Sequence, residues 1–295
     1  MRFLEKERLF WTEALTIAGS ASPLVLPRAL LFGLLALAVT VVHLEPMYPK
    51  LSIDLTPFEV AGGALSLLLV LRTNAGYERW WEARRLWGDI VNKSRNLAIA
   101  AITYGPDDPA WRDRIVRRAA AFSHAARLSL RGERARESLW RLLGVDEAEQ
   151  VLTAEHMPTA VAALIGESLR DARDRLGLDG FALLRLDPER AALIDDIGGC
   201  ERIMKTPLPL AYRVEIRRFL ILFIAVIPFA TVERLLWFTP IATVLIAAPL
   251  LAVDNIGTEL QVPFSKDSLN HLPLDDICAT IEGNLLAMLD QRATA

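Results

Sequence analysis

Side chains that could catalyse a reaction are present in this sequence, but they do not fall at catalytic spacings. Four histidines are scattered along the chain without metalloprotease spacing: His43, His124, His156 and His271. The sequence contains no GxSxG, GxGxxG or Walker phosphate loop. The acidic pairs Asp195–Asp196 and Asp275–Asp276 are more typical of solvated helix faces than of acid–base dyads. We therefore expect that the protein is not an enzyme.

Metal-binding and redox chemistry have equally little support. Cys200 and Cys278 lie far apart, and neither has a partner at metal-ligand spacing, which favours a reducing compartment without disulfides. Oxygen donors at Asp267, Ser268 and Asn270, in a loop bounded by prolines, could hold a hard cation. Turn and capping roles explain these three residues more simply. No cofactor is expected.

One stretch has a spacing that suggests a function: "VAGGALSLLLVLRTNAGYERWWEARRLWGDI", residues 60–90. On one helix Gly63, Leu67 and Leu71 share a face. Asn74 and Glu78 continue that face into polar sequence. A face that is apolar at membrane depth and polar below it suits the lining of a narrow pore, where rings of leucine can gate by dewetting. A plain core stripe would show the same spacing.

The composition favours a membrane protein with a large water-exposed part. Hydrophobic residues make up 53% of the 295 positions, yet 23% are charged and the net charge is −3. Four apolar segments stand out, at residues 24–44, 58–71, 219–232 and 235–253. Only the first and last approach the roughly 20 residues of a lone span. The shorter two are either core helices of a soluble protein or spans extended by polar residues that face other helices or water. We favour four spans.

Lysines and arginines predict the orientation in the membrane. The links between spans one and two and between spans three and four hold one basic residue each, Lys50 and Arg234. The opposite side holds Arg2, Lys6, Arg8, Arg28, Arg72, Arg79, Arg84, Arg85, Lys93, Arg95, Arg213, Arg217 and Arg218. Both termini and the middle region are therefore expected in the cytoplasm.

We expect four parts along the chain. Residues 1–104 hold the first two spans and a helix that continues into the cytosol, and 105–212 form a cytosolic helical region. Residues 213–262 hold spans three and four, and 263–295 form a cytosolic C-terminal segment. In the second part, a further helix is expected to start with Asp187 as N-cap and Pro188 at its first position.

A basic run also lies in the second part. Nine arginines fall between Arg112 and Arg141, against three acids. A nucleic-acid reader could look like this, but aromatic interleaving and a recognition motif are missing. We favour a solvated helix face beside anionic lipid or a neighbouring subunit, and expect no nucleic-acid partner.

Three stretches together resemble the bestrophin family, in its bacterial branch. They are "RTNAGYERWWEARRLWGDI" after the second span, "GCERIMKTPLPLAY" before the third and "IGTELQVPFSKDSLNHLPLDDI" after the fourth. The residues that carry this signature, and that we expect to be structural, are Arg72, Asn74, Arg79, Trp80, Trp81, Arg84, Trp87, Pro263 and Phe264. The resemblance implies an all-α, ring-shaped homopentamer in the bacterial inner membrane. Each subunit would have four membrane helices and a large cytosolic helical region around a single axial pore.

The resemblance also implies positions in the pore. Gly63, Leu67 and Leu71 would form the neck, where Gly63 departs from the bulkier residues that the family often carries. A second, cytosolic aperture would fall at Glu189, where an apolar residue is common. Five carboxylates there would favour cations.

The family's calcium-binding loop is degenerate in this chain. An acidic run follows "PF" in animal members, whereas this chain reads "PFSKDSLN". Lys266 stands where an acid would be, and Asp267 keeps the single carboxylate beside Asn270. Calcium binding is therefore not expected.

The expected function is a passive ion channel whose partners are monovalent ions, the lipid bilayer and further copies of the chain. Sodium or potassium is slightly favoured, and a chloride channel of the same architecture is the alternative. A membrane-anchored scaffold or sensor with a cytosolic partner-binding region is an alternative of another class, motivated by the basic run. A secondary transporter would show an inverted repeat and a midplane ion site, and the sequence shows neither.

Overall fold

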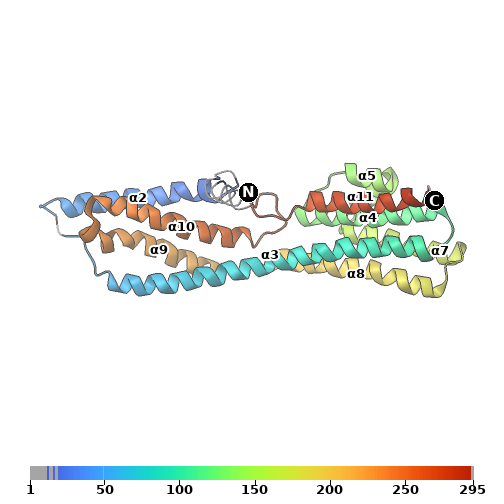
Figure 1. Ribbon diagram of the computed structural model, residues 1–295, viewed down its shortest axis with the longest axis horizontal. Coiled ribbons are helices and arrows are strands. Elements are labelled where there is room, and N and C mark those ends of the chain that lie inside the picture. Colours follow the sequence, from blue (N-terminus) through green and yellow to red (C-terminus); the bar gives the residue numbers. More distant parts are fainter. Residues whose placement is uncertain (1–11, 13–15, 17–18, 49, 294–295) are drawn as a thin grey trace, which may run out of the picture. The chain divides into compact units, whose positions relative to one another are not determined.

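The computed structural model describes residues 12, 16, 19–48 and 50–293. Arg2, Lys6 and Arg8, which entered the orientation argument, lie outside these ranges. The regular elements described are all helical (Figure 1). They are α2 (Ser22–Leu44), α3 (Thr56–Tyr104), α4 (Pro109–Arg131), α5 (Glu137–Leu143), α6 (Val145–Thr153), α7 (Met157–Arg175), α8 (Gly180–Lys205), α9 (Leu210–Leu235), the 3-10 turn η1 (Leu236–Phe238), α10 (Thr239–Glu259) and α11 (Leu274–Ala293).

The chain divides into two compact units, and the division falls inside α3. The first, here called the membrane unit, comprises Met1–Arg79, Leu208–Val262 and Asp267–Asn270. The second, here called the helical unit, comprises Trp80–Pro207, Pro263–Lys266 and His271–Ala295. Each unit is described by itself below.

In the membrane unit, α2, α9, α10 and the first part of α3 pack around one apolar core. That core consists of Val25, Ala29, Leu65, Leu69, Ile216, Leu220, Ile224, Ala247 and Leu251. Three segments are long and apolar enough to cross a membrane: Ser22–Leu44, Thr56–Tyr104 and Leu210–Glu259. The third contains two helices, α9 and α10, which lie side by side and are joined by η1 (Figure 1). The four apolar stretches of the sequence thus form four helices, the last two within one candidate segment.

Helix α3 carries the chain from apolar into charged sequence without a break. It runs for 49 residues and contains Gly88 in its interior. The flanking residues Trp87 and Ile90 are fully buried in the core of the helical unit. Burial of this apolar face outweighs the roughly 1 kcal/mol by which a mid-helix glycine is less favourable than alanine.

Two glycines let α3 and α10 approach closely in the membrane unit. A β-carbon built on Gly76 would lie 2.9 Å from the carbonyl oxygen of Gly257 and 3.3 Å from Cβ of Leu260. Because the nearest atom belongs to the backbone, no side-chain rotation can relieve that contact. Small residues at such crossings allow the backbone approach that stabilises helix pairs in membranes.

We expect Gly76→Ala to destabilise the protein by about 1–3 kcal/mol, since α10 must move to admit the methyl group. The measurement is the thermal unfolding midpoint of purified protein in detergent. Gly63→Ala is the matched control on the same helix, because a β-carbon there meets no atom within 4 Å. Equal midpoints for the two variants would contradict this account of the crossing.

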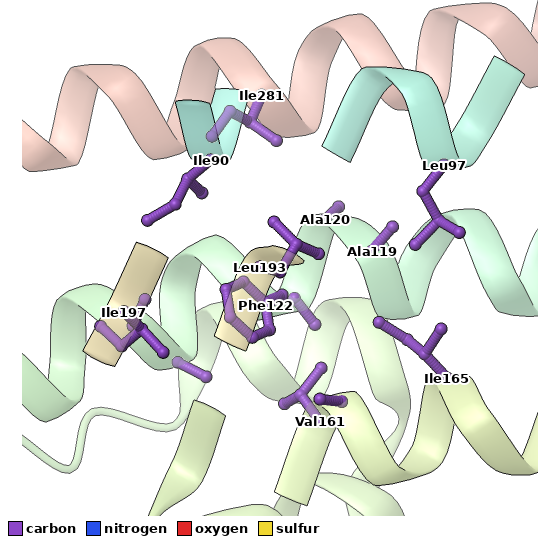
Figure 2. Close-up of a cluster of buried hydrophobic side chains, with 14 of the residues drawn as sticks. Ile90, Leu97, Ala119, Ala120, Phe122, Val161, Ile165, Leu193, Ile197 and Ile281 are labelled. Carbon is purple, nitrogen blue, oxygen red and sulfur yellow. The ribbon is translucent and has the colours of Figure 1, made fainter. Parts of the chain in front are cut away.

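The helical unit is built around α4, which packs against α5, α7, α8 and α11. Alanines on α4, including Ala119 and Ala120, pack together with larger side chains such as Phe122 in the buried cluster (Figure 2). The bounds of α4 follow from local chemistry. The Asp108 carboxylate accepts hydrogen bonds from the backbone N–H groups of the first turn. Gly132, with φ of +66°, ends the helix in the left-handed conformation.

The start predicted for a helix at Asp187 is wrong. Helix α8 begins at Gly180, where the side chain of Asp179 accepts a hydrogen bond from the N–H of Phe181 at 3.0 Å. Pro188 therefore lies inside α8, and the Asp187 carboxylate pairs with Nε of Arg190 at 2.6 Å instead of capping. Aspartate can either cap a helix or pair with a side chain one turn away, so an aspartate alone does not mark a helix start. The apolar pattern of α8 extends to residues before Asp187, and the helix therefore begins earlier.

The basic run of α4 and α5 is not a solvated face throughout. Seven of the nine arginines form ion pairs: Arg112, Arg117, Arg118, Arg127, Arg131, Arg136 and Arg141. Several of these pairs reach other helices, as Arg131 does to Asp275 of α11. The run therefore ties α4 and α5 to neighbouring elements, because most of the carboxylate partners lie outside the helix of the arginine; Asp113, the partner of Arg117, lies on α4 itself.

Candidate functional site

The pore face expected on α3 is exposed in the membrane unit. The side chains of Leu67 and Leu71 are 61% and 49% exposed, and no atom approaches the open side of Gly63. On the same helix, Leu65 and Leu69 are buried in the core. At about 100° per residue, these buried leucines lie on the side of α3 opposite to Leu67. One side of the helix therefore packs within the chain, and the other offers apolar side chains to something outside it.

The signature residues fall into three groups. Arg72, Trp87, Pro263 and Phe264 are buried; Asn74, Trp81 and Arg84 are exposed; Arg79 and Trp80 are intermediate. Trp87 and Phe264 belong to the core of the helical unit, and Trp80 packs against it. The burial of Trp87 and Phe264 is what a structural role requires.

A charged cluster lies behind the apolar face, where α3, α9 and α10 meet. Arg72, whose side chain is 1% exposed, pairs through Nη1 with the carboxylate of Asp254 and donates from Nη2 to Oγ1 of Thr258 at 2.9 Å. Arg217 donates from Nε to the same carboxylate at 3.4 Å and from Nη2 to Thr258 at 3.1 Å. One carboxylate and one hydroxyl thus serve two guanidinium groups.

Sequence reasoning did not find this cluster. Arg72 belongs to the sequence signature, Arg72 and Arg217 belong to the basic residues that predict orientation, and Asp254 belongs to no predicted site. The sequence does contain one indication of the cluster: Arg72, Arg217 and Asp254 each lie at the end of an apolar segment. Charges at such positions on different helices can lie at the same depth in the membrane. The pairing itself could not be read, because Arg72 and Asp254 are 182 residues apart.

Glu189, the expected aperture residue, has a partner in the helical unit. Its Oε1 accepts a hydrogen bond from Nη1 of Arg185 at 2.5 Å, one turn earlier on α8. The side chain of Glu189 is half-buried, and that of Arg185 is exposed. An ion pair of this kind has no net charge. A ring of Glu189 residues would then be accompanied by a ring of arginines, so the electrostatic argument for cations loses its basis.

The loop expected to be a degenerate calcium site is held by protein groups. Glu259 accepts hydrogen bonds through its carbonyl from Oγ of Ser268 and through its carboxylate from the N–H of Leu269. Lys266 pairs with Glu133 at 2.9 Å. Asp267 and Asn270 are exposed. Across the part of the chain that the structure describes, no group of three or more His, Cys, Asp and Glu side chains is placed to hold a metal ion.

The two thiols are buried and poor nucleophiles. Burial raises the pKa of Cys278 to about 12, and burial raises that of Cys200 further. Near Cys200, the pKa of Asp196 is raised because burial outweighs its 2.7 Å pair with Nζ of Lys93. Asp196 thus pairs α8 with α3, Cys278 of α11 donates to the carbonyl oxygen of Ser123 on α4, and both thiols serve packing rather than bond-making chemistry.

The pair of His124 and Glu282 in the helical unit makes the stability of the protein depend on pH. Nε2 of His124 lies 2.9 Å from the carboxylate of Glu282, which also accepts two hydrogen bonds from Arg141. Burial lowers the pKa of His124, and the attraction of Glu282 offsets this only in part. Nδ1 of His124 is buried and has no hydrogen-bond partner among the described residues. Protonation would therefore bury an unpaired N–H.

We expect the protein to lose stability as the pH falls below about 6.5, the pKa of histidine in an unfolded chain. Below that value the unfolded chain takes up a proton that folded His124 resists, because its pKa is lowered. The measurement is the unfolding midpoint between pH 7.5 and pH 5.5. His124→Gln should flatten the curve over this range, and an unchanged slope would assign the pH response to other groups.

A comparison with family models identifies the chain. The model described as "Bacterial/Fungal Bestrophin protein" matches residues 2–287. The chain belongs to the bestrophin family. This confirms the resemblance drawn from the three sequence stretches and excludes an enzyme, because members of the family are ion-channel proteins.

The names of curated relatives of this bestrophin state a function. A protein of Ralstonia nicotianae is 35% identical over 90% of this chain and 87% of its own length. Another, from Escherichia coli K12, is 35% identical over 92% of this chain and 89% of its own. Both are named voltage-dependent anion channel-forming proteins. Those names concern anions, whereas the sequence argument slightly favoured cations.

Solved structures agree with the family assignment. The crystal structure of a bacterial bestrophin homologue from Klebsiella pneumoniae matches with a TM-score of 0.82 at 30% identity, covering 90% of this chain and 98% of the other. The fold of this bestrophin is therefore that of an all-α, multi-pass membrane protein. The apolar segments counted in the sequence are its membrane part.

Proposed function

We propose that this bestrophin is a passive anion channel in which several copies of α3 line one axial pore. The neck would be formed by Gly63, Leu67 and Leu71, and a second constriction would lie at Glu189. The observation that carries the proposal is the apolar, unpacked face of α3 on a membrane helix whose opposite face is fully packed. In a membrane bundle, such a face meets lipid, another subunit or a pore.

Two observations favour a pore on that face. First, the apolar face of α3 is followed, after Leu71, by the exposed side chains of Asn74 and Glu78 on the same face, and such polar groups suit a water-filled path. The family, in addition, is one of channels. A lipid-facing helix would instead be expected to keep apolar side chains to the membrane boundary and end there.

Selectivity for anions is supported by the relatives and by charge. The two relatives named above are both called anion channel-forming proteins. The ion pair of Glu189 with Arg185 offsets the negative charge of the carboxylate ring that would have favoured cations. We therefore adopt the chloride alternative in place of sodium or potassium.

The decisive experiment is a reversal potential in a planar bilayer. Purified protein should give discrete currents, and in a sodium chloride gradient the reversal potential should move toward the chloride equilibrium potential. A shift toward the sodium potential would restore the cation hypothesis. Protein that inserts but gives no current under either polarity would overturn the channel itself.

A homopentamer is part of the proposal, with both termini and residues 105–212 and 263–295 in the cytoplasm. Mass measurement in detergent tests the assembly, and a monomer or dimer would favour a membrane-anchored scaffold. No specific observation now supports that scaffold, because seven of the nine arginines that suggested it form ion pairs. Cysteine labelling at Lys50 and Asp276 from either side of the membrane tests the orientation.

A further inference from the structure

The charged cluster of the membrane unit holds more positive than negative charge. Arg213, one turn before Arg217 on α9, is near enough to interact electrostatically with Arg72. Its Nε is buried and has no hydrogen-bond partner among the residues described. Arg72 and Arg217 share the single carboxylate of Asp254, and Arg213 lies near Arg72 without an ion pair of its own among the described residues. We call these three arginines with Asp254 the arginine layer, whose formal excess is two positive charges.

Neighbouring carboxylates do not cancel this excess. Glu215 of α9 pairs with Arg218 at 2.7 Å. Glu259 of α10 accepts a hydrogen bond from the backbone N–H of Leu269 and keeps its negative charge, but it is not among the groups that act most strongly on Arg72. Glu78 lies on the exposed face of α3, nearly two turns beyond Leu71, and its negative charge disfavours anions. The ionised groups that act most strongly on Arg72 are one carboxylate, Asp254, and two guanidinium groups, Arg217 and Arg213, so the balance around Arg72 is positive.

Stability alone does not account for so many arginines. One buried arginine and one carboxylate already form a neutral pair, and apolar residues often replace such pairs without loss. Additional guanidinium groups on the same carboxylate repel one another. The charge of Arg72 is buried and therefore poorly screened by salt, so its field reaches farther than that of the exposed Arg217. An excess of positive charge that does not stabilise the fold, and whose field reaches beyond the cluster, indicates that the cluster acts on permeating ions.

We propose that the arginine layer determines selectivity, by biasing the inner end of the neck toward anions. Arg72 directly follows Leu71, so each copy of α3 would place this positive charge behind the last ring of the neck. The layer does not touch the ion; it lowers the energy of an anion, and raises that of a cation, through the intervening helix. The inference rests on the proposed function and assigns its anion preference to particular residues.

Arg217→Gln is the first test, because its side chain is 52% exposed and the fold should tolerate the change. Arg218→Gln, on the same helix with an exposed side chain, is the matched control. In planar bilayers, the chloride-to-sodium permeability ratio should fall about threefold or more in Arg217→Gln and stay at the wild-type value in Arg218→Gln. Arg213→Gln should act in the same direction, and Arg217→Lys should preserve the ratio because the charge is kept.

The outcomes separate this inference from the proposed function. A wild-type channel that is silent or selects sodium overturns the proposed function. A wild-type channel that selects chloride, with unchanged ratios in both Arg217→Gln and Arg213→Gln, overturns the arginine layer alone. Equal losses in Arg217→Gln and Arg218→Gln would mean that net surface charge, and not this cluster, sets the ratio. Glu78→Gln should raise the ratio, since it removes the opposing carboxylate.

Discussion

Leu67→Ala is expected to raise single-channel conductance by about twofold or more, and Leu67→Ala with Leu71→Ala by more than either alone. In the proposed pore these side chains form stacked apolar rings, where water is held weakly and an ion loses part of its hydration. Alanine widens each ring and lowers the barrier to wetting. Both leucines are largely exposed in the single chain, so truncation leaves no cavity in the core.

The matched control for the neck is Leu31→Ala on α2. Leu31 is as exposed as Leu67 and lies on an apolar helix that the proposal does not place in the pore. Its conductance should equal that of the wild type. If Leu31→Ala and Leu67→Ala change conductance alike, or if neither does, then Leu67 faces lipid or a neighbouring subunit rather than the ion path.

Arg118→Met is expected to lower the free energy of unfolding by about 3–5 kcal/mol. Arg118 is 7% exposed and joins three helices of the helical unit. It bonds two carboxylate oxygens of Glu147 on α6, and Nη1 donates to the carbonyl oxygen of Leu164 and the hydroxyl of Ser168 on α7. Methionine fills much of the volume but removes all four hydrogen bonds and leaves Glu147 without its cationic partner. Denaturant or thermal unfolding in detergent measures the loss.

The adjacent arginine provides the control for Arg118. Arg117 pairs with Asp113 one turn earlier on the same helix, and both side chains are more than a third exposed. Arg117→Met should therefore cost less than about 1 kcal/mol, as solvated pairs within one helix do. Similar losses for the two variants would show that the buried bonds of Arg118 add nothing beyond a surface ion pair.

Much of the fold follows from local pattern. The apolar segments at 24–44, 58–71, 219–232 and 235–253 predict α2, the start of α3, α9 and α10, because a hydrophobic run of that length is read from neighbouring residues alone. The same holds for the continuous helix α3, whose sequence contains no proline after Pro57. The motif stretches resemble one family, and the family model confirms it.

The pairing of Glu189 could also have been read from the sequence. Arg185 stands four residues before it, a spacing that places the two side chains together on any helix. The erroneous helix start at Asp187 hid this signal, since it left Arg185 outside the helix. The argument for cations therefore considered the carboxylate of Glu189 without its Arg185 partner.

Other features exist only through contacts between distant parts of the chain. The sequence by itself determined that this is a membrane protein with a leucine face on a long helix, because those properties depend on composition and helical period. The tertiary structure alone decided that Leu65 and Leu69 pack inward while Leu67 and Leu71 do not. It also decided that Arg72, Arg217 and Asp254 share one site and that Arg118 is buried. The physical reason is that burial and charge pairing depend on which helices meet, and residues 182 positions apart carry no local signal of that meeting.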